Sequence, residues 1–122
     1  MRNDMRQIAS WTEVTADYGE IREVVLPDGS HIWLHNDTRV VYPDTFTGGR
    51  RQVFVSGEIY AEIESDSHCP FVVSADNVNV IVKGTTFNMR SYPETDNVEL
   101  TLIEGDVDLE YTTSWGKARL WW

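Results

Sequence analysis

The 122-residue sequence lacks several features on which other protein classes depend. It has one cysteine, Cys69, so an internal disulfide is impossible and the fold must rest on a hydrophobic core. Basic residues are few: 10 against 20 acidic ones give a net charge of −10. Nucleic acids and anionic membranes are bound by clustered Lys and Arg, so this charge argues against both ligands. The basic pair Arg50-Arg51 is too small to reverse it.

Long apolar runs are also missing. No stretch approaches the roughly 18 residues that a membrane helix needs, although 41% of the residues are hydrophobic. A chain of this length is the size of one ordinary domain and can remove roughly two-thirds of its unfolded surface from water. We therefore expect a single domain with its own core.

Apolar and polar residues alternate with a period of two in repeated short stretches, as in strands with one buried face. Within residues 58–63, for example, three apolar residues alternate with Glu58, Tyr60 and Glu62. Turn signals separate about nine or ten such stretches, at intervals of about eight to twelve residues. The pattern predicts an all-β fold, specifically a two-sheet sandwich of jelly-roll-like type.

Turn chemistry marks the places where we expect the chain to reverse or bend. A hairpin turn is predicted where a proline that presets its φ, an aspartate that can bond the turn backbone and a glycine that can take a positive φ follow one another. These residues are Pro27, Asp28 and Gly29. Three further glycines are predicted to serve a bend, a close backbone approach and the turn into the last strand. They are, in that order, Gly57, Gly84 and Gly105.

Two histidines four positions apart, His31 and His35, flank Trp33. In a helix this spacing would suit a metal, but on a strand the two residues lie about 13 Å apart. Zinc requires both nitrogens at about 2 Å, and the His-x-His cluster of cupins is absent, so we predict no metal site. Trp33 then either packs under a neighbouring strand or loop, or belongs with both histidines to an exposed partner surface.

Catalytic signatures are absent as well. The sequence contains no Gly-rich phosphate loop and no Gly-x-Ser-x-Gly elbow. Glu58 and Glu62 share a strand face, but at about 13 Å apart they exceed the roughly 5 to 9.5 Å between the carboxylates of glycosidases. We therefore predict that the chain is not an enzyme and needs no cofactor.

Seven short motifs follow one another between residues 18 and 111, and each alone is an ordinary turn or strand. They are VLPDGS (25–30), WLHN (33–36), VYP (41–43), RQVFVSGEIY (51–60), PFVV (70–73), VIVKGTTFN (80–88) and VELTLIEGDV (98–107). In this order they resemble the signature of the FecR domain. Two departures, Lys83 where many relatives have Leu and Ala61 where an aromatic is usual, bear on packing alone.

The resemblance implies a single-pass inner-membrane regulator of a Gram-negative bacterium, with this chain as its periplasmic part. In such anti-sigma factors a cytoplasmic part binds an extracytoplasmic-function sigma factor. The periplasmic part receives a signal from the N-terminal extension of a TonB-dependent outer-membrane transporter. The chain would thus relay the state of iron or glycan uptake to transcription. Its partners would be proteins, and it would reach the membrane through a helix outside this sequence.

The two ends of the chain are expected to differ from its middle. Met5, Ile8 and Trp11 recur about every three residues, which predicts a short amphipathic N-terminal helix within residues 1–16. We expect residues 1–17 to be a lead segment and residues 18–122 to be the FecR-like domain, without the C-terminal domain that follows in relatives. The last residues resemble the start of a further strand, and we expect the apolar surface there to be covered by a longer chain or by a partner. This surface consists of Trp121 and Trp122.

Two alternatives to the relay function stay open. A carbohydrate-binding jelly roll could stack a sugar on Trp33 or Trp115. A structural or assembly domain could instead pair the edge strands of identical copies. The relay reading rests on the order of the motifs, which neither alternative explains.

Overall fold

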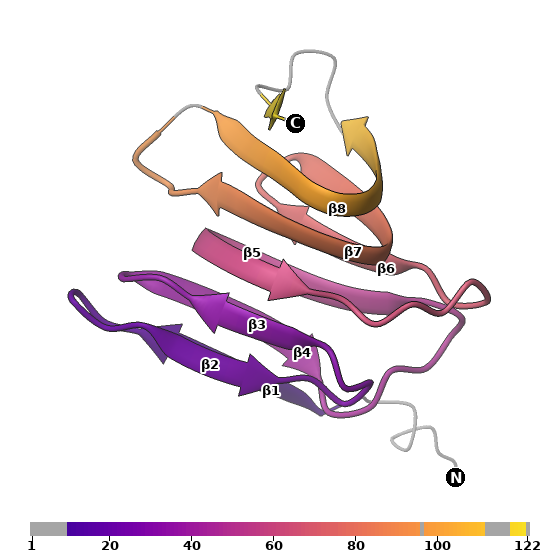
Figure 1. Cartoon of the computed structure of the whole chain (residues 1–122). Coiled ribbons are helices and arrows are strands. Elements are labelled where there is room, and N and C mark those ends of the chain that lie inside the picture. The colour runs from indigo at the N-terminus through magenta and orange to yellow at the C-terminus, as the bar shows by residue number, and fades with distance from the viewer. Residues whose placement is uncertain (1–9, 96, 112–117, 122) are drawn as a thin grey trace, which may run out of the picture.

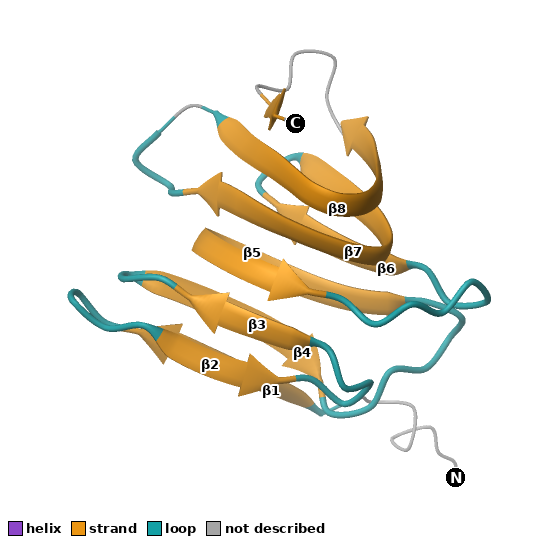
Figure 2. Ribbon diagram, in the orientation of Figure 1, coloured by secondary structure: helices purple, strands orange, loops and turns teal. Residues whose placement is uncertain are grey.

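The computed structural model describes residues 10–95, 97–111 and 118–121, in which nine strands and no helix occur (Figures 1 and 2). The strands are β1 (Trp11–Ala16), β2 (Arg22–Val25), β3 (His31–Leu34), β4 (Thr38–Pro43), β5 (Arg51–Glu62), β6 (Phe71–Ala75), β7 (Val78–Ser91), β8 (Val98–Tyr111) and β9 (Ala118–Trp121). The prediction of an all-β fold is confirmed. Within the described ranges, no helix is long and apolar enough to cross a membrane.

All nine strands belong to one hydrogen-bonded network that folds back on itself into two layers. The first layer runs in the order β1, β4, residues 51–56 of β5, β6, residues 78–83 of β7 and residues 106–111 of β8. The second runs β2, β3, residues 57–62 of β5, residues 86–91 of β7, residues 98–104 of β8 and β9. Three long strands therefore cross from one layer to the other.

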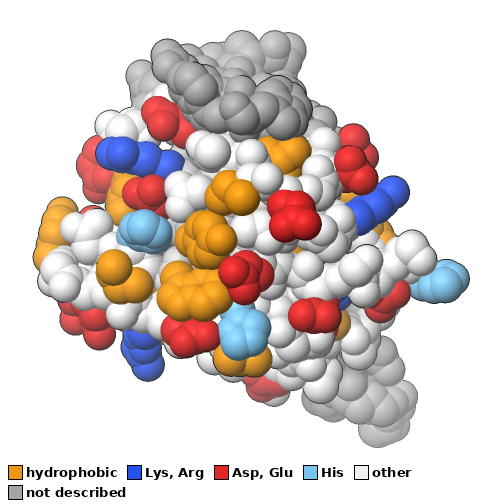
Figure 3. Space-filling model, in the orientation of Figure 1, with side chains coloured by type: hydrophobic (Ala, Val, Ile, Leu, Met, Phe, Trp, Pro, Cys, Tyr) orange, Lys and Arg blue, Asp and Glu red, His pale blue; other side chains and the backbone are white. Residues whose placement is uncertain are grey.

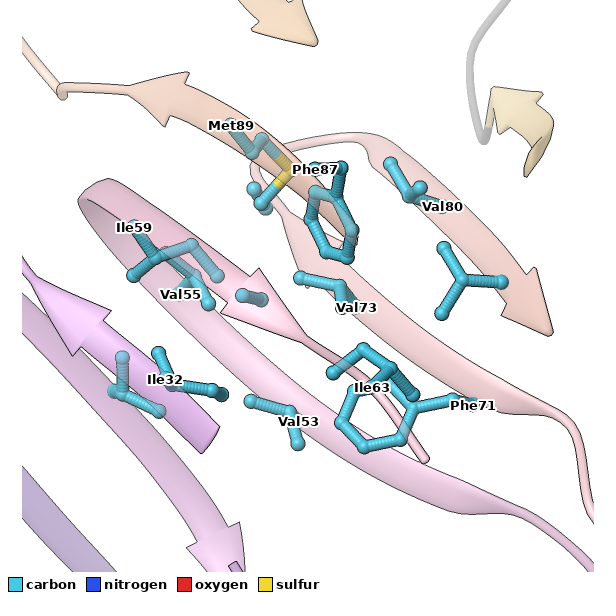
Figure 4. Packing of buried hydrophobic residues seen from close by; sticks show 14 of the residues in the cluster. Ile32, Val53, Val55, Ile59, Ile63, Phe71, Val73, Val80, Phe87 and Met89 are labelled. Atoms are coloured by element: carbon cyan, nitrogen blue, oxygen red, sulfur yellow. The ribbon is translucent and has the colours of Figure 1, made fainter. Parts of the chain in front are cut away.

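The hydrophobic core lies between the two layers (Figure 4). The first layer contributes side chains such as Val53 and Val73, and the second contributes Ile32, Ile59 and Phe87, all without solvent exposure. Burying an apolar side chain of this size stabilises the fold by roughly 1.5–3 kcal/mol. The core thus depends on both layers facing each other closely.

The three crossing strands bend at glycines with positive φ. Gly57 in β5 has φ +119°, Gly84 in β7 has φ +52°, and Gly105 in β8 has φ +102°. A Cβ at Gly57 would lie 2.8 Å from the Thr38 Cα, and one at Gly105 would lie 2.7 Å from the Gly84 carbonyl oxygen. Each of these sites therefore requires glycine for its backbone angle and for its contact.

Two buried threonines supply hydrogen bonds where the ladders are interrupted. At the β5 bend, the Thr38 hydroxyl accepts from the Glu58 N–H at 2.9 Å and lies 3.2 Å from the Glu58 carbonyl oxygen. At the β7 bend, the Thr85 hydroxyl accepts from the Lys83 N–H at 3.1 Å and donates to the Asp106 carbonyl at 2.8 Å. Buried backbone groups at both bends thus keep their partners.

The predicted Pro27-Asp28-Gly29 turn joins β2 to β3 and is tied to a buried arginine. Asp28 accepts hydrogen bonds from the Ser30 N–H and hydroxyl, at 3.0 and 2.8 Å. Its Oδ2 also lies 2.7 Å from Nη1 of Arg51, which is 2% exposed and donates to two backbone carbonyls. The Arg51 guanidinium lies 5.2 Å from the centre of the Phe71 ring. Arg51, the second half of the basic pair seen in the sequence, is therefore part of the interior.

One sequence-based prediction needs correction. The helix predicted within residues 1–16 is wrong over Trp11–Ala16, because these residues form β1 and pair with β4 over their whole length. Residues 1–9 lie outside the described part of the chain.

Substitution of Gly57 by Ala is expected to cost about 3 kcal/mol or more, since it adds a steric clash to an unfavourable φ. Gly48→Ala is the matched control, because Gly48 has φ +78° but open space around its Cβ position. It should cost only about 1–2 kcal/mol. Urea unfolding of both variants measures the difference, and equal losses would show that contact at the bend is unimportant.

Arg51→Met is expected to destabilise the protein by about 3–5 kcal/mol, because it leaves the Asp28 carboxylate half enclosed without its cation. The neighbouring Arg50 is exposed, so Arg50→Met should change stability by no more than about 0.5 kcal/mol. Thermal and urea denaturation of the two variants test this contrast. A small effect at Arg51 would contradict a structural role for the pair.

Candidate protein-interaction face

The outer face of the second layer carries two of the five residues predicted to contact a partner, His31 and Trp33. On β3, Ile32 and Leu34 point into the core, while His31 and Trp33 alternate with them on the outer side. Trp33 is half-buried on that face. Trp33 therefore lies on the outer face of the second layer and not in the core, and its place in a partner surface stays a prediction.

Three rings on this face form a continuous row, which we call the aromatic ridge: His31, Trp33 and Tyr60. The His31 ring stacks on the Trp33 ring, with centroids 5.7 Å apart and planes inclined by 22°. Tyr60 on β5 is the register partner of Trp33, and their ring centroids are 5.6 Å apart at 54°. Tyrosine and tryptophan on a rigid surface are the residue types that most often anchor protein interfaces.

Glu23 on β2 borders the aromatic ridge on one side. It is the register partner of Trp33, and its Oε2 lies 2.8 Å from Nδ1 of His31. Both side chains of this pair are partly exposed, 47% for Glu23 and 42% for His31. The contact orients the imidazole along the ridge.

Glu58 and Glu62 border the aromatic ridge on the other side. They occupy the outward positions of β5 immediately before and after Tyr60. Glu58 accepts a hydrogen bond of 2.9 Å from the Asn88 side chain on β7. Figure 3 shows the result on this side of the molecule, where hydrophobic side chains gather in a strip with acidic and histidine side chains beside it.

His35, the second of the two histidines that flank Trp33, follows β3 directly. Its backbone N–H donates to the Glu58 carbonyl at 2.9 Å, and its side chain is half-buried. His31 is engaged with Glu23 instead of facing His35. In the part of the chain that the structure describes, no group of three His, Cys, Asp or Glu side chains could hold a metal ion.

The terminal tryptophans of the predicted partner surface are only partly covered by the structure. Trp121 belongs to β9, where its backbone is in register with Thr101 of β8. Trp122, and Trp115 of the carbohydrate alternative, lie outside the described residues. The assignment of Trp121 and Trp122 to a partner surface stays a prediction.

A second aromatic surface, on the outer face of the first layer, was missed in the sequence. Trp11 on β1 and Phe54 on β5 are 47% and 46% exposed, and their ring centroids are 5.8 Å apart. They line a shallow groove with Pro43 and Arg50. The alternation of Trp11, Glu13 and Thr15 with smaller inward residues could have identified β1 as a strand.

Tyr18 is an exposed tyrosine whose hydroxyl has a shifted pKa. The Asp37 carboxylate beside it, by its charge and by a hydrogen bond, raises the pKa of the Tyr18 hydroxyl above its ordinary value of 10.0. The hydroxyl is therefore uncharged at neutral pH. Tyr18 lies in the segment between β1 and β2, outside the aromatic ridge.

Comparison with known proteins finds one matching family model. Residues 12–108 match the family model described as FecR protein. No curated protein matches the chain.

Two crystal structures, each described as that of a candidate anti-sigma factor from Parabacteroides distasonis, share the fold. The first has 31% sequence identity and a TM-score of 0.83, over 86% of this chain. The second has 32% identity and a TM-score of 0.81, over 84% of this chain. The alignment spans 49% of the length of each of those proteins, so the chain corresponds to about half of them.

The packing of the ridge predicts a measurable coupling between Trp33 and Tyr60. A double-mutant cycle with Trp33→Leu and Tyr60→Leu should give a coupling energy of about 0.5–1.5 kcal/mol in urea unfolding. Both single variants should remain folded, because the two rings lie outside the core. The control cycle pairs Trp33 with Phe54, on opposite faces of the sandwich, and should give no coupling. Zero coupling in the first cycle would mean that the ridge is not a packed unit.

Proposed function

The chain belongs to the FecR protein family, and from this membership we propose that it is the periplasmic signal-relay domain of a membrane-anchored anti-sigma regulator. The match over residues 12–108 carries the proposal. The two similar anti-sigma structures support the same coarse role, that of a signalling regulator. We assign the domain no enzymatic activity, since the family is a regulatory one.

The proposed partners are proteins on the two sides of the inner membrane of a Gram-negative bacterium. In the periplasm, the domain receives the state of a TonB-dependent outer-membrane transporter from the N-terminal extension of that transporter. Through a membrane helix and a cytoplasmic part, the regulator acts on an extracytoplasmic-function sigma factor. Because the chain spans about half of the similar proteins, these partners are proposed for the whole regulator.

The aromatic ridge supports a role in protein contact. Its three rings are held by stacking and by register pairs on two central strands, so they are ordered before any partner binds. A surface that is rigid beforehand loses less conformational entropy on binding. The ridge is therefore our candidate for the surface that receives the signal.

The two alternative functions receive less support from the structure. The carbohydrate alternative rests on Trp33 and Trp115, and Trp115 lies outside the described residues. Assembly through the β1 edge is opposed by Arg22, whose Nη1 donates to the Thr15 carbonyl at 3.1 Å. A side chain that caps an edge carbonyl in this way hinders the addition of another strand.

The proposal is tested in the bacterium that encodes the chain, with a reporter gene under a promoter of the cognate sigma factor. The transporter's substrate should change reporter activity when the full-length regulator is present. In-frame removal of residues 10–121, or of the transporter's N-terminal extension, should abolish that dependence. A regulator carrying Trp11→Ala serves as the control and should respond normally, with regulator levels compared by immunoblot. A response that survives removal of residues 10–121 at normal protein level would refute the relay.

A further inference from the structure

The surroundings of Trp33 combine an aromatic ring with several carboxylates. Across the strands, its register partners are Glu23 on β2 and Tyr60 on β5. Glu58 and Glu62 stand diagonally from it on β5, at the distance of about 7–8 Å at which long side chains still meet. The indole is thus flanked by acidic side chains on both neighbouring strands.

Glu23 is bonded to His31, whereas Glu58 and Glu62 have no cationic partner among the described residues. Glu62 makes no side-chain hydrogen bond or ion pair with any residue that the structure describes, and Glu58 is bonded by the neutral Asn88 amide. Arg90 on β7 is the register partner of Glu58. Its guanidinium, however, lies over the Tyr92 ring, 5.4 Å from the centre of that ring. Within a chain of net charge −10, this face therefore attracts cations.

A guanidinium group suits this arrangement better than an ammonium group. It is planar, so it can stack on the indole while its N–H groups donate to carboxylates at the edge of the ring. From this geometry we propose that the aromatic ridge binds an arginine side chain of the protein partner, stacked at Trp33 between Glu23, Glu58 and Glu62. This inference rests on the proposed function. The proposed function requires a protein partner, and the inference specifies the chemistry of the partner's contact.

The spacing of the carboxylates also indicates the form of the partner segment. Glu58 and Glu62 are four residues apart on one strand, which corresponds to about 13 Å. An extended segment lying along β5 presents every second side chain to it, at intervals of about 6.6 Å. A central arginine at the ridge thus places the residues two before and two after it over Glu58 and Glu62. The partner segment is therefore extended and basic at these three alternate positions.

The first test titrates the ¹⁵N-labelled 122-residue chain with the peptide acetyl-Lys-Gly-Arg-Gly-Lys-amide. The Trp33 indole N–H signal should shift and saturate, with a Kd on the order of 1 mM, as expected for a short peptide. Raising the salt concentration from about 50 to about 300 mM should weaken binding, since exposed charges are screened. The same titration with acetyl-Glu-Gly-Gln-Gly-Glu-amide should leave the signal unchanged.

Matched variants assign the effect to the ridge. Trp33→Leu should abolish binding, and the double variant Glu58→Gln, Glu62→Gln should raise the Kd at least about fivefold. Trp11→Ala, which removes an equally aromatic but less acidic surface, should leave the Kd unchanged. Equal affinity for a peptide with lysine in place of the central arginine would overturn the stacking of a guanidinium. Peptide shifts centred on Trp11 would overturn the site.

Failure of this inference can be told apart from failure of the proposed function. The full-length regulator carrying Trp33→Leu, or the double glutamine variant, is placed in the sigma-factor reporter assay. Loss of the response to the transporter's substrate is expected for both. A normal response in both would refute the arginine site and leave the relay standing. A reporter that ignores the transporter's substrate with the unaltered regulator would refute the relay, whatever the peptide titration shows.

Discussion

The two-layered fold depends on the bends in three strands. β5, β7 and β8 each supply hydrogen-bonded pairs to both layers, so the sandwich closes only if all three turn at matching positions. The bends at Gly84 and Gly105 touch each other, because the Gly105 α-carbon faces the Gly84 carbonyl oxygen with no room for a methyl group. Strands that change layers at bends are the usual way in which a sheet folds onto itself. The core then follows from the two faces that this folding brings together.

These bends also show what could be predicted from the sequence. Buried and exposed residues alternate on both sides of Gly84 in β7. The buried positions are even-numbered up to Val82 and odd-numbered from Thr85 onward, so the alternation changes phase at the glycine. A change of phase reads as the end of one strand and the start of another, although here it is a bulge within β7. In β5 the buried positions are odd-numbered on both sides of Gly57, so alternation alone predicts one long strand there.

Other features could not be predicted because contacts between residues distant in sequence determine them. The three-residue spacing of Met5, Ile8 and Trp11 suggested a helix, but pairing of β1 with β4 decided the local structure. The adjacent arginines Arg50 and Arg51 do not differ in local pattern, yet Arg51 is enclosed by Asp28 and by carbonyl groups distant in sequence. The partner of Trp33 in the ridge, Tyr60, likewise became identifiable only through the register of β3 with β5. Local patterns could locate the outward face of a strand but not its neighbours.

The bend at Gly57 and the aromatic ridge are mechanically connected. Glu58 follows Gly57 directly, and its carbonyl oxygen receives the His35 N–H while its own N–H bonds to the buried Thr38 hydroxyl. The backbone beneath the ridge is therefore fixed on both sides by the same contacts that hold the bend. Under the proposed function, a partner that docks on the ridge would contact a strand whose backbone is held by the same hydrogen bonds as the bend at Gly57.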